Sequence, residues 1–265
     1  MSSVQSMQAG AVPSADATRG LIDWPAVDST WKSLYKVADV AALVAFSANV
    51  LDVILGFGET DIIVNGTKTA SEWFALYQEN WFKGLYTLGL LNIIYMAALV
   101  PVYLAIFTAH RRANGLYAAL AMIVSFIGMA IYIANSAAIP MWVLSGKYAA
   151  ATTDAQRAIF AAAGEAVLAR GEDFTPGSFI GLILGGIAAI TMSFVMLRGG
   201  IFGKATAWIG MIGFTFLSVF TIWATFIPVL YSVAFYVFGM IGGLLALVWF
   251  VLVSLTLFKL GRTEK

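Results

Sequence analysis

Four polar side chains lie inside long apolar stretches of the sequence: Asn49, Asp52, Asn92 and Asn135. Asn49 and Asp52 are three residues apart, so a helix would place both on one face. A carboxylate at the centre of a membrane helix costs about 2.5–3.5 kcal/mol on insertion scales, and such groups mark ion, proton or ligand sites. Amide side chains also bridge neighbouring membrane helices, at about 0.6 kcal/mol each. The sequence favours this structural role and leaves a polar ligand cluster of the four residues as the alternative.

The sequence offers little material for metal or covalent chemistry. It contains one histidine, His110, and no cysteine, so neither a zinc site nor a multi-histidine copper or iron site can be assembled from these residue types. Glycine-rich phosphate-binding motifs and the GxSxG nucleophile motif are also missing from the sequence. We therefore expect no metal and no cofactor. His110 precedes Arg111 and Arg112, and we interpret the three residues as a basic anchor on the cytoplasmic side.

An intramembrane enzyme that acts on lipid or polyprenyl substrates is a further interpretation. Such chemistry needs paired acids, or an acid beside a metal. The acids available here have the pattern of a solvated helix face, so this interpretation ranks last. The acids and the accompanying anion-binding groups would be Asp154, Glu165, Glu172, Asp173, Arg157 and Arg170.

Composition indicates the solvent that the elements face. The chain of 265 residues is 61% hydrophobic and 11% charged, whereas a soluble domain carries about 25% charged residues. Too few polar side chains remain to cover a surface in water, so hydrocarbon must surround much of the molecule. The net charge of +1 and the lack of a long basic tract argue against nucleic acid as a partner.

The fold class that we predict is an all-α membrane protein with six transmembrane helices arranged as three hairpins. Residues 1–33 would form an N-terminal cytoplasmic tail or interfacial segment, and residues 34–265 a single transmembrane domain. Most of the 15 Lys and Arg residues then fall on one side, so the positive-inside rule places both termini in the cytoplasm. The six stretches long enough to cross about 30 Å of hydrocarbon are 37–57, 85–107, 116–138, 178–198, 206–227 and 234–258.

Two segments between the predicted spans have the pattern of short amphipathic helices on the outer surface. Thr69 and Glu72 have capping-box spacing, and so do Thr153 and Gln156. We expect both helices to lie along the membrane surface with their apolar side down. The predicted interfacial or partner contacts on them are Trp73, Tyr77, Trp81, Arg157 and Glu165.

Two Gly-x-x-x-Gly patterns predict close packing between helices. They are Gly181 with Gly185 and Gly239 with Gly243. Small residues at this spacing let two helix backbones approach each other in a membrane. We favour packing inside one bundle and keep a dimer face as the alternative.

Three segments of the sequence resemble a large family of bacterial multi-pass membrane proteins that is catalogued as a domain of unknown function. These segments are KYAAATTDAQRAIFAAAGEAVLA, VMLRGGIFGKATAWIG and the final LFKLGR, and the similarity spans roughly residues 125–262. The resemblance implies six transmembrane helices and a bacterial cytoplasmic membrane. It supplies no catalytic or binding residues.

These features favour a non-enzymatic integral membrane protein, either an accessory or structural subunit or a helical bundle that binds lipid and partners. Its partners would be membrane lipids, with other membrane subunits or a second copy of the chain as further candidates. The alternative is a small-solute transporter or channel built on the polar cluster around Asp52. That alternative predicts that Asp52, Asn49, Asn92 and Asn135 converge on one water-accessible cavity.

Overall fold

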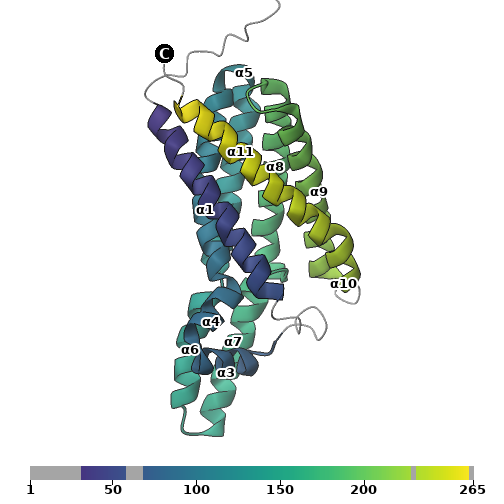
Figure 1. The fold of residues 1–265 in the computed structure, drawn as a ribbon. Coiled ribbons are helices and arrows are strands. Elements are labelled where there is room, and N and C mark those ends of the chain that lie inside the picture. The colour runs from purple at the N-terminus through teal and green to yellow at the C-terminus, as the bar shows by residue number, and fades with distance from the viewer. Residues whose placement is uncertain (1–30, 58–67, 228–230, 263–265) are drawn as a thin grey trace, which may run out of the picture.

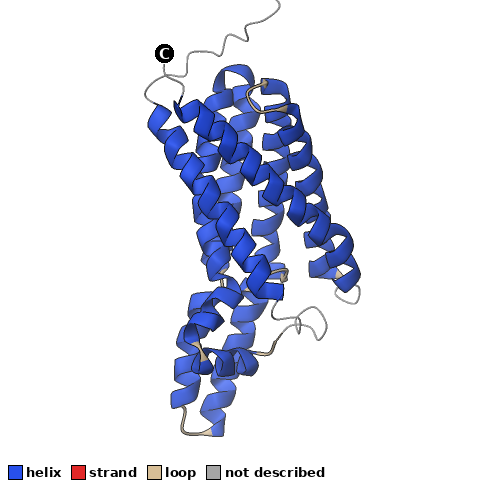
Figure 2. Cartoon of the chain, viewed as in Figure 1, coloured by secondary structure: helices blue, strands red, loops and turns tan. Residues whose placement is uncertain are grey.

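Helices make up nearly all of the described chain, and no strand occurs in it (Figure 2). The structure is a computed structural model that describes residues 31–57, 68–227 and 231–262. Two elements, η2 and η4, are single π-helical turns. In chain order the elements are α1 (Lys32–Phe57), α3 (Ala70–Glu79), α4 (Trp81–Leu85), η2 (Tyr86–Leu90), α5 (Leu91–Asn135), α6 (Ala138–Ala150), α7 (Asp154–Gly171), α8 (Pro176–Gly199), α9 (Lys204–Phe226), α10 (Tyr231–Ala234), η4 (Phe235–Gly239) and α11 (Met240–Arg262).

Five helical stretches within the described residues are long and apolar enough to cross a membrane. The prediction of an all-α membrane protein is therefore confirmed at this level. Residues 1–30, most of the predicted N-terminal tail, lie outside the part of the chain that the structure describes. The five stretches are Lys32–Leu55, Trp81–Ala150, Asp154–Gly199, Lys204–Phe226 and Tyr231–Arg262.

Helix α5 consists of two antiparallel limbs. Its 45 residues would extend for about 68 Å if straight, more than twice the thickness of the hydrocarbon. The backbone instead leaves the helical region at Asn114, with φ −144° and ψ 46°. Side chains from before and after this point meet across the limbs, since Tyr103 contacts Ser125 and Tyr132 contacts Asn92. The reversal separates two of the predicted spans.

The long helices form a closed ring. Helix α1 packs against the first limb of α5, the second limb packs against α8, and α9 and α11 complete the circuit back to α1 (Figure 1). In α1, Ala38, Ala42 and Ala45 face inward and are buried, while Val37 and Val40 face outward. Small residues inside and large apolar residues outside are typical of helices that pack in a membrane.

The end of the bundle that holds both ends of the described chain is solidly packed. Helix α1 begins there, α11 ends there, and α5 reverses there (Figure 1). Ser254 of α11 donates a 2.6 Å hydrogen bond to Asp39 of α1. The interior at this end is filled by large side chains with little or no exposure: Val102, Ile106, Met192, Met196, Phe250, Val253 and Leu257.

Helices α3, α4, α6 and α7 extend beyond the opposite end of the bundle (Figure 1). Helices α6 and α7 form an antiparallel hairpin that prolongs the second limb of α5 and α8, and α3 packs on both of them. The expectation that α7 lies flat with an apolar face on lipid was wrong. That face is covered by protein, since Gly164 and Leu168 are buried and Gly164 lies against Phe74 of α3.

Helix α3 has the capping box that the sequence predicts. The Thr69 hydroxyl accepts from the Glu72 backbone amide, and Glu72 accepts from the Thr69 backbone amide at 2.6 Å. The hydrogen bonds that the Thr69 backbone amide and hydroxyl donate to the Glu72 carboxylate lower the pKa of Glu72. Glu165 of α7 holds the same end of the helix, because its carboxylate accepts from the Ala70 amide at 2.7 Å. The predicted contact residue Glu165 therefore anchors α3 within the chain.

The aromatic face of α3 is an internal contact. Trp73 and Tyr77 are 1% and 3% exposed, and the Tyr77 hydroxyl donates to the Ala138 carbonyl at 2.8 Å. Burial raises the pKa of the Tyr77 phenol. Our assignment of Trp73 and Tyr77 to a membrane interface was therefore wrong, because α6 and α7 cover them. Trp81 differs, since it is 53% exposed and stacks on Trp142.

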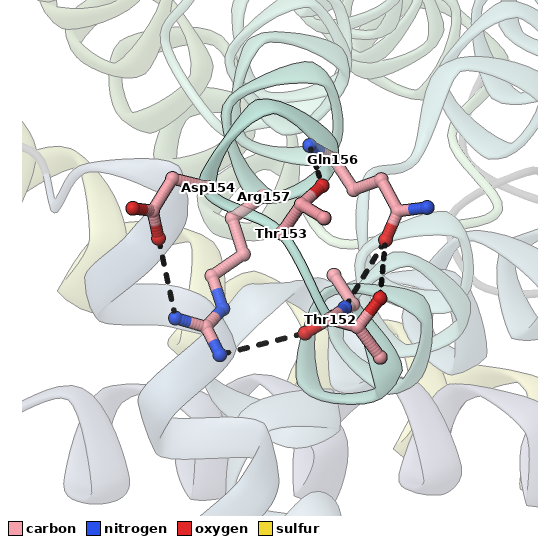
Figure 3. A network of polar contacts seen from close by, with 6 residues as sticks. Thr152, Thr153, Asp154, Gln156 and Arg157 are labelled. Carbon is pink, nitrogen blue, oxygen red and sulfur yellow. Dashed lines mark hydrogen bonds and ion pairs between the residues drawn. The ribbon is translucent and has the colours of Figure 1, made fainter.

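The tip of the α6–α7 hairpin begins α7 with side-chain caps (Figure 3). Thr153 accepts from the Gln156 amide at 3.3 Å, as its spacing predicts. The Gln156 side chain accepts from the amide of Thr152 at 3.1 Å, one residue earlier than in a standard capping box. Arg157 lies 3.6 Å from Asp154 and donates to the Ala151 carbonyl. These exposed groups therefore define a local turn.

Candidate functional site

A cavity of about 400 Å³ lies inside the ring of helices, in the half that adjoins the α7–α8 link. Cavities of about 300–1,000 Å³ accommodate drug-sized ligands. The residues that line it come from all the long helices of the ring and from η4. They include Asn49, Asp52, Asn92, Tyr95, Met96, Leu99, Tyr103, Met129, Tyr132, Asp173, Phe174, Gly185, Phe214, Phe220, Tyr231, Phe235, Gly243, Trp249 and Phe250.

A group of polar side chains lies at one end of the cavity, around Asp173 in the link between α7 and α8. Asn92 donates to Asp173 Oδ2 at 2.9 Å, and the Tyr132 hydroxyl donates to Asp173 Oδ1. The two limbs of α5 thus hold this carboxylate in one orientation. Asp52 of α1 lies close enough for its charge to interact with that of Asp173.

Asp52 is available for a further interaction. It lines the cavity together with Asn49, one helical turn earlier, and it is half-buried. Within the described residues, no hydrogen bond or ion pair engages its carboxylate. This part of the chain therefore presents an acceptor that no described residue engages, beside the carboxylate of Asp173, which is already fixed.

Aromatic side chains surround this polar end. The ring of Phe174, the residue after Asp173, lies 4.8 Å from that of Phe220 and 6.4 Å from that of Tyr231. Tyr231 in turn stacks on Phe235. Phe174 has φ 60°, a left-handed conformation that costs on the order of 1–3 kcal/mol for a side chain of this size. The strained backbone at Phe174 turns the chain so that Asp173 and the aromatic ring both reach the cavity.

The remaining walls are mostly apolar, and small residues keep the space open. A side chain added at Gly185 or at Gly243 would meet no atom within 4 Å, so these two predicted packing residues face the cavity. Gly181 does pack as predicted, because a Cβ there would lie 2.9 Å from Tyr132. Gly239 lies between these cases, with its nearest neighbour, Phe235, at 3.3 Å. One Gly-x-x-x-Gly residue thus joins helices, and two leave room for a ligand.

Helices α1 and α11 separate toward the cavity. They lie together where Lys36 meets Gly261, and they diverge along their length toward α10 (Figure 1). Asp52 of α1 and Gly243 of α11 both line the cavity.

Three of the four residues in the predicted polar cluster line this one cavity: Asn49, Asp52 and Asn92. The fourth does not. Asn135 donates to the Gly177 carbonyl at 2.9 Å and accepts from Arg170 at 2.9 Å. It therefore ties the end of α5 to the end of α7 and the start of α8, which is the structural role that the sequence favours.

Asp173 and Tyr132 were missed as cavity groups. The sequence interpretation placed Asp173 on a solvated helix face together with Asp154, Glu165 and Glu172, but these acids do not share one face. Asp154 lies at the α6–α7 tip and Glu165 of α7 accepts from the Ala70 amide of α3, whereas Asp173 lines the cavity. Its position three residues before the helix-starting proline Pro176 was a signal for a turn at the bundle end.

His110 differs from its prediction as a basic anchor. It is fully buried and donates from Nδ1 to the Ile106 carbonyl at 2.9 Å, and it stacks on Phe202 at 5.5 Å. His110 is therefore a core residue at the packed end of the bundle, while Arg111 and Arg112 remain exposed there. Among the described residues, no group of three or more His, Asp or Glu side chains could hold a metal ion.

Comparison with protein-family models, curated proteins and solved structures finds no match to this chain. The resemblance to a bacterial membrane family consequently stays a prediction.

Proposed function

We propose that this chain is a non-enzymatic, integral membrane protein that binds a small amphiphilic molecule inside its helical bundle. The observation that carries the proposal is the cavity, which has a polar end at Asp52 and Asp173 and mostly apolar walls. A ligand that matches this lining has one polar group and one apolar body. Accessory contacts with other membrane subunits are compatible with this role and would use the surface of the bundle.

In this proposal the chain crosses the membrane six times, counting α1, the two limbs of α5, α8, α9 and α11. The location is a bacterial cytoplasmic membrane, with both termini in the cytoplasm. Support comes from the reversal of α5 at Asn114, from the common end of α1 and α11 (Figure 1), and from the positive-inside rule. The α6–α7 hairpin then projects outside the cell.

The topology can be tested by labelling single cysteines, because the chain contains none. We expect Lys147→Cys, at the exposed end of α6, to react with a membrane-impermeant maleimide on intact cells. Lys204→Cys, exposed at the start of α9, should react only after the cells are permeabilised. Labelling of both positions on the same side would contradict the proposed orientation.

Ligand binding can be tested by filling the cavity. Leucine at Gly243 would project into open space, so Gly243→Leu should fold and should lose ligand binding by about tenfold or more. The measurement is the melting temperature of purified protein in maltoside micelles, with tryptophan fluorescence as the signal. The probes are three ten-carbon amphiphiles: decanol, decanoate and decyltrimethylammonium.

The matched control is Gly146→Leu, the same substitution at an exposed site on α6 where a Cβ also meets nothing within 4 Å. We expect at least one probe to stabilise both the wild type and Gly146→Leu, in a saturable way, and to leave Gly243→Leu unchanged. A response that is equal in all three proteins would come from the micelle and would refute the proposal.

A transporter is the second candidate, because Asn49, Asp52 and Asn92 do line one cavity. Transport would require the cavity to open alternately to the two sides of the membrane, and the packed end of the bundle would have to open for one of them. Met196 is fully buried at that end. A Met196→Cys variant in membrane vesicles should stay unreactive toward a maleimide if the protein only binds its ligand. Labelling that depends on added amphiphile would favour transport.

A further inference from the structure

We infer that the ligand of this cavity is a cationic amphiphile, with an ammonium headgroup held between Asp52 and Asp173. The inference rests on the proposed function and adds the charge class of the ligand. It depends on three features of the described residues: the charge balance of the lining, the free carboxylate of Asp52 and the aromatic side chains around the polar end.

The charge balance of the lining is entirely negative. Asp52 and Asp173 line the cavity, and no Lys, Arg or His among the described residues does so. A cation inside the cavity would be attracted strongly by these carboxylates, because the dielectric constant there is low. A carboxylate or phosphate ligand would instead be repelled by both aspartates and would find no cation to pair with.

The two aspartates are not equivalent, and the difference indicates where the headgroup sits. Asp173 already accepts hydrogen bonds from Asn92 and Tyr132, so its position is fixed. The carboxylate of Asp52 lacks such a partner in the described part of the chain. An ammonium group near Asp52 would compensate the charge there and would remain within reach of the field of Asp173.

The aromatic side chains favour a cation independently of the charges. Phe174, Tyr231 and Phe235 surround the space next to Asp173. Aromatic faces attract cations, and several rings grouped around an anionic residue are the usual recognition site for quaternary and methylated ammonium groups. This arrangement brings carboxylates and rings to the same end of the cavity.

The apolar remainder of the cavity determines the other half of the ligand. Met96, Leu99 and Trp249 line its deeper wall, and the packed end of the bundle closes it beyond them. A small hydrated cation would leave this apolar volume unfilled. An alkyl or aryl chain on the ammonium group would fill it.

The test compares decyltrimethylammonium, decanol and decanoate, which share one chain and differ in headgroup charge. With the intact chain in maltoside micelles, we expect decyltrimethylammonium to bind at least about tenfold more tightly than decanol and decanoate to bind more weakly still. Asp52→Asn should abolish the preference for the cation. Asp154→Asn, which removes an exposed charge at the α6–α7 tip, should retain it.

Each outcome decides one of the two proposals. If decanol and the cation bind the wild type equally and neither binds Gly243→Leu, the proposed binding function stands and the inference of a cationic ligand is overturned. A preference for decanoate, or a preference for the cation that survives both Asp52→Asn and Asp173→Asn, also overturns the inference. If no probe distinguishes the wild type from Gly243→Leu, the proposed function fails as well.

Discussion

Replacing Gly171 with alanine should destabilise the protein by about 3 kcal/mol or more, the largest effect that we expect from a single methyl group. A Cβ at this position would lie 1.9 Å from the Asn135 carbonyl oxygen and 2.6 Å from the Ala137 nitrogen. Both are backbone atoms, so no side chain can move aside. Overpacking commonly costs about 1–3 kcal/mol, and more when the backbone must shift.

The effect should be concentrated where the α5–α6 and α7–α8 links cross. Ala137 donates to the Gly171 carbonyl at 3.3 Å, and this hydrogen bond would break as the links separate. The measurement is thermal unfolding in micelles, together with proteolysis of the α6–α7 hairpin. Gly146→Ala is the control, because its Cβ meets nothing within 4 Å, and it should be neutral or slightly stabilising. Equal stability of the two variants would show that the links do not pack as described.

Replacing Asp173 with alanine should cost about 2–4 kcal/mol and should also remove ligand binding. The substitution leaves the Asn92 amide and the Tyr132 hydroxyl without their acceptor. An unsatisfied buried donor costs about 1–3 kcal/mol. The hydrogen bonds that hold Asp173 against α5 would be lost, and they would no longer offset the strain of the backbone at Phe174.

Two further variants separate the loss of charge from the loss of hydrogen bonds. Tyr132→Phe removes one donor and keeps Asp173 charged, so it should cost about 1 kcal/mol and preserve binding. Asp173→Asn retains one acceptor oxygen and should be less destabilising than alanine. Thermal unfolding and the decyltrimethylammonium titration measure both properties. If Asp173→Ala were as stable as the wild type, Asp173 would not organise the site.

Part of the site could be predicted from the sequence because a polar residue in an apolar stretch is conspicuous. Asn49, Asp52 and Asn92 were found in this way, and each lines the cavity. Asp173 escaped notice because it lies among other charges next to α7, where acids are ordinary. Tyr132 escaped because tyrosine is common in membrane helices. Their role depends on a contact across 41 residues, which no local pattern encodes.

The outer helices show the same limit of local patterns. The capping box of α3 was predicted correctly, because it depends on residues three apart. The partner of its aromatic face was not, since an apolar face has the same pattern whether it packs on lipid or on protein. Trp73 and Tyr77 pack against α6 and α7. The helices that we expected on the membrane surface therefore form an extension of the bundle.

The sequence by itself determined the solvent and the elements: a charge content of 11% requires hydrocarbon around the chain, and apolar length indicates the helices. Tertiary structure decided what those helices enclose. Gly185 and Gly243 have the same motif as Gly181, yet only their positions in the ring make them cavity walls. Helix formation is a local property of hydrogen bonding along the chain, whereas a cavity and its charge arise only where several distant segments meet.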